Sequence, residues 1–227
     1  MNLEQWFKEH LLFDEKKRDD EIAYEYFKYT GVRLLDVGCG TGRFIGMGSM
    51  QLPLKGYWFE GIDKNPRSVE KCTEKGMEVI CGDATKMPYD ANTFNGIHCS
   101  HLIEHLQPER AYALLKEIDR VLKPGKILIL RAPMLHPGFY DDFTHVKPYH
   151  PKAILHYLNE KGDYEQTTFE PLKSKYKLIK LRYRFAPLFY YSTSTVLLGL
   201  GNLLMRFRIH SGIVTGFMLV MQKERFV

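Results

Sequence analysis

A glycine-rich segment near residue 40 could bind a ligand through its main chain. The sequence DVGCGTG at 36–42 follows a short apolar run and precedes a stretch with helical spacing. Glycine allows a tight turn and a close approach of ligand to backbone. Exposed N–H groups at the start of the following helix attract an anionic or polar group. The segment predicts a ligand-binding turn between a strand and a helix; an ordinary tight turn is the alternative.

A carboxylate at a second strand end fits the same ligand. Asp63 ends the predicted strand 57–62, and such an acid can accept hydrogen bonds from ribose hydroxyls. Dinucleotide enzymes use an acid in this way, so Asp63 alone does not separate the cofactor classes. The dinucleotide fingerprint G-x-G-x-x-G fails at its last position, which is Arg43.

Histidines and acids gather in the segment 133–151. Its members are His136, Asp141, Asp142, His145 and His150. A neutral histidine near pH 7 can accept a proton from a reacting group. These residues could also surround a metal, but no tight ligand motif is present, so we expect none. The spacing of three and four at His98, His101 and His105 imitates one helix face, although His98 falls in a predicted strand.

Strand and helix patterns alternate along the chain, which predicts an α/β fold with helices on both faces of a parallel sheet. The predicted strands are 33–37, 57–62, 77–81, 94–99, 127–130, 178–185 and 214–221, and the clearest helices are 108–122 and 152–161. In strand 178–185 clean alternation places Ile179, Leu181, Tyr183 and Phe185 on one face. A helix pair is expected in 3–29, with the charged run 14–20 as its junction or as a solvated turn.

The glycine pattern resembles the first motif of the class I S-adenosylmethionine-dependent methyltransferases. Asp63, the turn Gly82-Asp83-Ala84 and the segment Ser100–Leu106 match later motifs, and the resemblance covers about 33–162. It implies a Rossmann-like fold with a seven-stranded, mostly parallel sheet in the order 3-2-1-4-5-7-6. It also implies S-adenosylmethionine as cofactor, with S-adenosylhomocysteine as product. Asn95 departs from the family, which often has an acid there.

The same resemblance implies the cofactor contacts. Asp63 would bind the ribose hydroxyls, Asp83 the adenine amino group, and the Ala84 N–H an adenine ring nitrogen. The segment that starts at Ser100 would flank the methionine end. The expected set is Asp36, Gly38, Cys39, Gly40, Gly42, Asp63, Lys64, Asp83, Ala84 and Ser100.

The segment 141–149 resembles a loop beside the acceptor pocket in glycan and lipid methyltransferases, where an acid precedes a Thr-His pair. His145 is therefore a candidate general base, with a nearby acid fixing its tautomer. Alternatively, His145 and Asp142 latch the loop over the cofactor. His105 belongs to a Glu-His pair that is common in the family, and it is a second candidate base or a structural or cofactor-side residue.

Charge is distributed unevenly along the chain. The whole chain carries +5, and residues 171–223 hold nine bases and no acid, so the remainder carries −4. A basic quarter suits a membrane surface, a nucleic acid or an anionic substrate. A solvated basic face is the alternative.

A charge-free stretch of 20 residues, 186–205, lies between the last two predicted strands. We reject a membrane span, because the final strand must return to the same sheet. Polar positions recur at spacings of three and four through Ser192, Thr195, Gly199, Asn202 and Arg206, which predicts an amphipathic helix in 186–208. A broad apolar face between arginines suits a membrane interface. Packing against the core, or against a second copy of the chain, is the alternative.

We expect one methyltransferase domain over 1–227, with helices in 1–30, a cofactor-binding core in 31–162 and the last strands in 163–227. The expected reaction is O-methylation of a lipid or lipid-linked acceptor at a membrane surface. Alternatives are a soluble glycan or small-metabolite methyltransferase and a non-catalytic cofactor-binding scaffold. Nucleic acid is not expected, since no RNA-binding module is recognisable. Four cysteines without CxxC spacing and a charged start without an apolar segment predict the cytoplasm.

Overall fold

The computed structural model describes residues 15–31, 33–51, 57–158, 169–170, 172 and 174–224. Its seven strands form one sheet in the order β3-β2-β1-β4-β5-β7-β6. They are β1 (Arg33–Val37), β2 (Trp58–Asp63), β3 (Glu78–Cys81), β4 (Phe94–Ser100), β5 (Leu122–Pro133), β6 (Tyr176–Phe185) and β7 (Val214–Lys223). Strands β1 to β5 pair in parallel, and β7 is antiparallel to β5 and β6. The predicted strand order and the antiparallel strand are confirmed.

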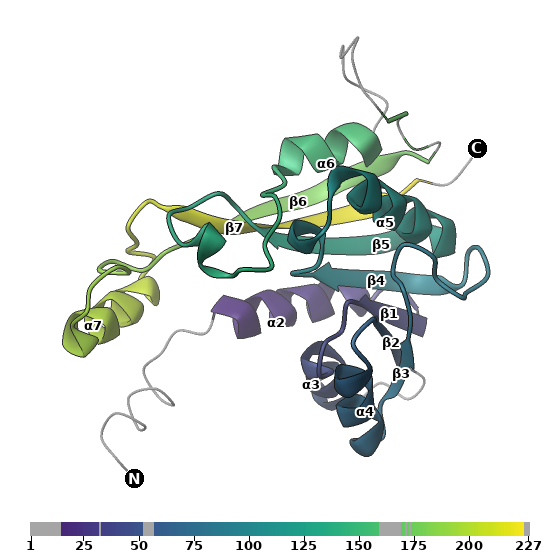
Figure 1. Cartoon of the computed structure of the whole chain (residues 1–227), viewed down its shortest axis with the longest axis horizontal. Helices are drawn as coiled ribbons and strands as arrows, with labels where there is room; N and C mark the ends of the chain where they lie inside the picture. Colours follow the sequence, from purple (N-terminus) through teal and green to yellow (C-terminus); the bar gives the residue numbers. More distant parts are fainter. Residues whose placement is uncertain are drawn as a thin grey trace.

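Helices cover both faces of the sheet, with α2, α3 and α4 on one side and α5 and α6 on the other (Figure 1). The helices are α2 (Glu15–Phe27), α3 (Arg43–Gln51), α4 (Pro66–Glu74), α5 (Pro108–Val121), α6 (Pro151–Leu158) and α7 (Thr195–Met205), with short 3-10 turns η1 (Ile103–His105) and η2 (Phe139–Asp141). Each face has its own buried apolar cluster. The first helix expected in 3–29 and the end of the helix expected in 152–161 lie outside the described residues. The single-domain organisation stays a prediction.

Strand β6 departs from the alternation expected for it. Leu178 pairs with Met221 and Lys180 with Val220, so Ile179 is an extra residue opposite two consecutive partners. A bulge of this kind shifts the side-chain alternation by one position. Ile179 therefore does not share the face of the later odd-numbered residues, and it is 41% exposed.

The charged run at the start of α2 is neither a junction nor a solvated turn, because Asp19 and Asp20 are buried. Asp20 pairs with Arg131 of β5 at 2.5 Å and with Arg43 at the start of α3. Asp19 pairs with Arg131 at 3.3 Å and with Arg182 of β6. The expectation was wrong because a helix pattern cannot show that arginines from three other elements converge on these carboxylates.

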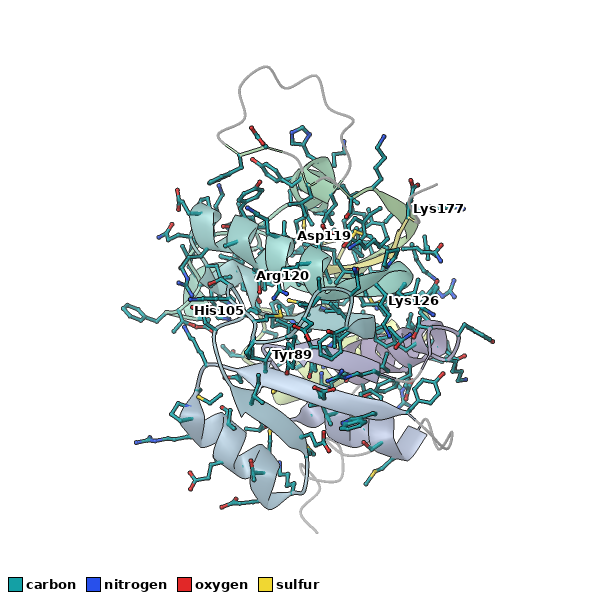
Figure 2. The ribbon with its side chains drawn as sticks, turned by 90° about the vertical axis from the view of Figure 1, so that its right-hand side faces the viewer. Tyr89, His105, Asp119, Arg120, Lys126 and Lys177 are labelled. Carbon is teal, nitrogen blue, oxygen red and sulfur yellow. The ribbon has the colours of Figure 1, made fainter. Side chains whose placement is uncertain are left out.

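Polar bonds to α5 fix neighbouring segments against the sheet. Asp119 accepts hydrogen bonds from Ser174 Oγ and Tyr176 OH, each at 2.9 Å. Arg120 donates to the Tyr89 carbonyl at 2.6 Å. Figure 2 shows Asp119 and Arg120 on α5. Through these bonds α5 holds the start of β6 with the residues just before it, and also the loop between β3 and β4.

We expect Asp20→Ala to lower the free energy of unfolding by about 3–5 kcal/mol, because it removes one partner of a buried ion pair. Urea denaturation measures the change. Glu25→Ala is the matched control on the same helix, since Glu25 forms an exposed pair with Lys28 at 2.6 Å. Exposed pairs contribute little, so its effect should be small. Equal effects of the two substitutions would contradict the anchoring role of Asp20.

Candidate active site

The glycines between β1 and α3 have different structural tasks. Gly38, Gly40 and Gly42 have φ angles of +72°, +54° and +77°, which side-chain-bearing residues rarely adopt. A Cβ at Gly42 would lie 2.4 Å from Met77 Sδ, and one at Gly38 would lie 3.1 Å from Leu102. A Cβ at Gly40 would have no neighbour within 4 Å. Gly42 and Gly38 thus permit close packing, whereas Gly40 leaves the main chain open to a ligand.

The structure brings Asp63 to this turn, as expected. Its Oδ2 accepts a hydrogen bond from Gly40 N at 2.8 Å, and its Oδ1 accepts one from Asn65 N at 2.8 Å. A carboxylate has about four lone-pair sites, so each oxygen can still accept from a ligand hydroxyl. The neighbouring Lys64 is exposed. The turn and Asp63 together form a polar cradle at the carboxyl ends of β1 and β2.

Asp36 and Cys39 lie beneath the turn. Asp36 is buried and bonded to His98 Nδ1 at 2.7 Å, and the His98 ring stacks on Phe44 at 3.7 Å. Burial raises the pKa of the Cys39 thiol, which keeps it neutral at pH 7. The Cys39 main chain is bonded within the fold, because its N–H donates to the Ile62 carbonyl at 3.2 Å and its carbonyl accepts from Gly42 N at 3.0 Å. The contact expected between Cys39 and the cofactor stays a prediction.

Asp83 follows β3 and carries partners that the sequence did not indicate. Its carboxylate accepts hydrogen bonds from Thr85 N at 2.9 Å and from Thr85 Oγ1 at 2.8 Å. Arg110 Nη2 of α5 lies 3.0 and 2.8 Å from its two oxygens. Partial burial opposes ionisation, but these bonds outweigh it and lower the pKa of Asp83 to about 2. An amino group that binds Asp83 must share the carboxylate with Arg110. The adjacent Ala84 packs against the core.

The segment after β4 borders the glycine turn. Ser100 ends the strand opposite Arg131, and Leu102 reaches the turn at Gly38. Glu104 in η1 is 0% exposed, and its Oε1 lies 3.1 Å from His101 Nδ1. Burial lowers the pKa of His101. Ser100 thus lies at the end of β4 with a buried carboxylate close behind, and its place beside the methionine end of the cofactor stays a prediction.

The loop between β5 and α6 docks on η1 and joins two candidate bases. Val146 N and Lys147 N donate to the Glu104 carbonyl at 2.8 and 3.2 Å. These bonds place His145 next to His105, with ring centroids 4.9 Å apart. Figure 2 labels His105 in the segment that follows β4. Residues from two distant parts of the sequence thus form one histidine pair.

The tautomer of His145 is set by a main-chain carbonyl. Its Nδ1 lies 2.6 Å from the carbonyl oxygen of Phe139, which can only accept, so Nδ1 carries the proton. Asp142 lies 3.7 Å from Nε2, too far for a hydrogen bond. The expected acid partner was therefore wrong, because Asp142 instead accepts the Thr144 hydroxyl at 2.6 Å. His145 Nε2 remains the lone-pair nitrogen.

His105 has the same arrangement. Its Nδ1 lies 3.0 Å from Thr144 Oγ1 and 3.1 Å from the Thr144 carbonyl oxygen. Because that hydroxyl gives its proton to Asp142, both Thr144 oxygens act as acceptors toward Nδ1. His105 Nε2 is therefore also a lone-pair nitrogen. Two imidazoles able to accept a proton stand side by side.

Sequence reasoning missed the site roles of Glu104, Arg110 and Thr144. The Glu-His and Thr-His pairs were visible as motifs, but each pointed to its histidine. No signal in the sequence indicated Arg110, whose partner lies 27 positions away.

The comparisons with known proteins agree with this geometry. A methyltransferase-domain family model matches residues 35–130, from β1 into β5. A 2-methyl-6-phytyl-1,4-hydroquinone methyltransferase of Oryza sativa subsp. japonica is 32% identical over 56% of this chain and 38% of its own length. A tRNA (carboxymethyluridine(34)-5-O)-methyltransferase of Arabidopsis thaliana is 29% identical over 44% and 24%. The chain thus matches well under half of either relative.

A solved S-adenosylmethionine-dependent methyltransferase from Archaeoglobus fulgidus shares the fold, with a TM-score of 0.61 and 21% identity over 98% of this chain and 100% of that one. Residues 35–130 thus belong to the methyltransferase-domain family, and the chain has the fold of the class I S-adenosylmethionine-dependent methyltransferases. S-adenosylmethionine is accordingly its cofactor. The open main chain at Gly40 and the Asp63 carboxylate beside it suit a ligand with ribose hydroxyls.

We expect Gly40→Ala to weaken S-adenosylmethionine binding by about tenfold or more, because the new methyl group fills the space open to the ligand. Its left-handed φ should reduce stability by only about 1–2 kcal/mol. Gly42→Ala, at a similar φ, should reduce stability further by collision with Met77. Calorimetric titration and urea denaturation separate the two effects. Binding at the wild-type level by Gly40→Ala would refute its contact with the ligand.

Proposed function

We propose that this methyltransferase modifies a hydroxyl oxygen of a lipid or lipid-linked acceptor at a membrane surface. The observation that carries the proposal is the exposed apolar face of α7 at the sheet edge where the cradle lies. The alternative acceptor is a soluble glycan or small metabolite, with α7 as a lid or a contact between two copies of the chain.

The insertion that contains α7 leaves the sheet at the ligand edge. Pro133 at the end of β5 pairs with Gly216 near the start of antiparallel β7. The segment between β6 and β7 therefore emerges beside the loop that follows β5, at the carboxyl ends where open α/β sheets bind ligands. Figure 1 shows α7 beyond that end of the sheet. The Tyr190 ring also contacts His136 of the loop, with centroids 6.5 Å apart.

One face of α7 is apolar and exposed. Val196 and Leu200 are 77% and 44% exposed, and Phe207, just beyond the end of the helix, is 71% exposed. The opposite face is packed, since a Cβ at Gly201 would lie 1.9 Å from the Leu188 carbonyl oxygen. The helix spans 195–205 only, shorter than the expected 186–208, because the chain forms turns before it.

Charge and length suit a helix that lies in a membrane interface. Arg206 and Arg208 follow α7 and are exposed. Cations beside an apolar face favour an anionic lipid surface. Within the described residues, no helix combines the length and apolar character that crossing a membrane requires. These features support peripheral attachment next to the acceptor entrance.

The proposed chemistry needs positioning and a proton acceptor. S-adenosylmethionine supplies an electrophilic methyl group on a sulfonium, so the protein must chiefly align the attacking oxygen. A hydroxyl becomes a better nucleophile as its proton leaves. His145 Nε2 and His105 Nε2 are the lone-pair nitrogens that could accept this proton.

The relatives offer acceptors of two classes. The Oryza relative is named for a phytyl hydroquinone, an acceptor with a long apolar chain. The Arabidopsis relative named above acts on tRNA, and the basic segment 171–223 of this chain gives RNA a specific observation in its favour. The exposed apolar face of α7 supports the lipid class, because RNA would not require it.

We expect a methyl label from S-adenosylmethionine to enter the organic phase of a fractionated cell extract. Asp63→Ala should abolish transfer, because it removes the acceptor for the ribose hydroxyls. Label confined to the aqueous phase would replace the lipid by a soluble acceptor, and label in RNA would favour the tRNA-like class. Tight cofactor binding without any labelled product would make the protein a scaffold.

We expect Val196→Glu with Leu200→Glu to prevent sedimentation with vesicles that contain phosphatidylserine, because two carboxylates would enter the interface. Both positions are exposed, so the fold should persist. Tyr29→Glu with Met50→Glu is the matched control, since these side chains are 87% and 84% exposed elsewhere. Equal sedimentation of both variants and the wild type would discard the membrane role of α7.

A further inference from the structure

We propose that Glu104, His105 and His145 form a binding site for a divalent transition-metal ion. One ligand atom from each of these residues lies within 4.8 Å of those of the other two. The site stands beside Ser100 and the glycine turn, at the edge where the acceptor must meet the methyl donor. The sequence predicted no metal, because η1 and the β5–α6 loop are far apart in the chain.

Both histidines present the correct nitrogen. A metal-binding imidazole is neutral, and its other ring N–H is typically held by a carbonyl or a carboxylate. His105 Nδ1 is held by Thr144 and His145 Nδ1 by the Phe139 carbonyl. These bonds set the tautomer and ring orientation and leave Nε2 as the nitrogen of each ring that carries the free lone pair.

Glu104 supplies an independent indication of a ligand. Its side chain is 0% exposed, and Oε1 is bonded to His101. Among the described residues, no donor reaches its Oε2. A buried carboxylate oxygen without a donor is costly, and a cation bound to it would remove that cost. His101 is then a positioning residue that orients the carboxylate.

The ligand set favours a zinc-like ion over magnesium or calcium. Two imidazoles with one carboxylate suit Zn²⁺ and its transition-metal neighbours, whereas Mg²⁺ and Ca²⁺ prefer oxygen ligands alone. Bonds of about 2.0–2.2 Å put tetrahedral ligands roughly 3.4 Å apart. The ligand atoms must therefore approach one another by up to about 1.4 Å on binding. Three protein ligands leave a position open, as in catalytic zinc sites.

Metal binding at this site does not depend on the proposed function. Only the part that the ion would play toward the acceptor hydroxyl rests on that function. An ion on both Nε2 atoms would occupy the lone pairs that otherwise accept the proton. The acceptor hydroxyl would then bind the ion, which lowers the hydroxyl pKa. Its O–H bond would break with transfer of the proton to water or to the exposed Asp142 carboxylate.

Titration of the chelator-treated full chain with Zn²⁺ and Co²⁺ tests the site. We expect one equivalent to bind, with a Co²⁺ visible spectrum typical of nitrogen and oxygen ligands at low coordination number. Glu104→Gln and His145→Ala should each weaken binding by at least about tenfold. His145 is only partly buried, so its variant keeps the test valid if Glu104→Gln fails to fold.

His150→Ala is the matched control, because His150 is an exposed histidine of the same loop outside the proposed set. It should bind the ion as the wild type does. Binding lost in this variant, or binding equal in the wild type and His145→Ala, would overturn the proposal. Absence of any bound ion would also overturn it and leave the histidines as direct proton acceptors. The proposed function is tested separately, by calorimetric titration with S-adenosylmethionine and by transfer of the labelled methyl group into the fractionated cell extract.

Discussion

The buried contact of two adjacent aspartates with arginines organises the active-site edge. Buried charges are costly unless they are paired, so Asp19 and Asp20 can lie under the sheet only where Arg43, Arg131 and Arg182 meet them. The contact ties α2 to β5, to β6 and to the start of α3. The main-chain carbonyl of Arg131 also accepts a hydrogen bond from His101 N at 3.1 Å. The same residue therefore anchors both α2 and the turn after β4. The helix that follows the glycine turn and the segment that follows β4 are thereby tied to the same group of ion pairs.

Parallel strands explain why the functional groups collect at one edge. The glycine turn, Asp63 and η1 all follow the carboxyl ends of strands that run side by side. The antiparallel return of β7 adds the α7 insertion to the same edge, opposite the end of β5. The glycine turn with Asp63, the histidine pair and the exposed apolar helix are therefore neighbours by topology, which is why an acceptor with an apolar chain fits the arrangement.

Backbone carbonyls control the chemistry of the histidine pair. The Phe139 carbonyl and the Thr144 oxygens accept hydrogen bonds from the two Nδ1–H groups and so keep the proton on Nδ1, and Asp142 acts one step further away by orienting the Thr144 hydroxyl. The loop conformation therefore decides which nitrogen is available, and docking of Val146 and Lys147 on the Glu104 carbonyl maintains that conformation. A buried acid and two correctly oriented imidazoles follow from one loop contact.

The sequence by itself determined the strand order, the glycine turn, the position of Asp63 at the end of a strand and the family resemblance, because these depend on local patterns and on a motif whose spacing is set by successive βα units. Tertiary structure alone decided the burial of Asp19 and Asp20, the Arg110 partner of Asp83, the bulge at Ile179 and the carbonyl partner of His145. Each of these depends on which distant atom arrives within about 3 Å, the reach of a hydrogen bond. A sequence pattern records residue types and their spacing. It does not show which residues far apart in the chain come within hydrogen-bonding distance, because folding alone brings them together.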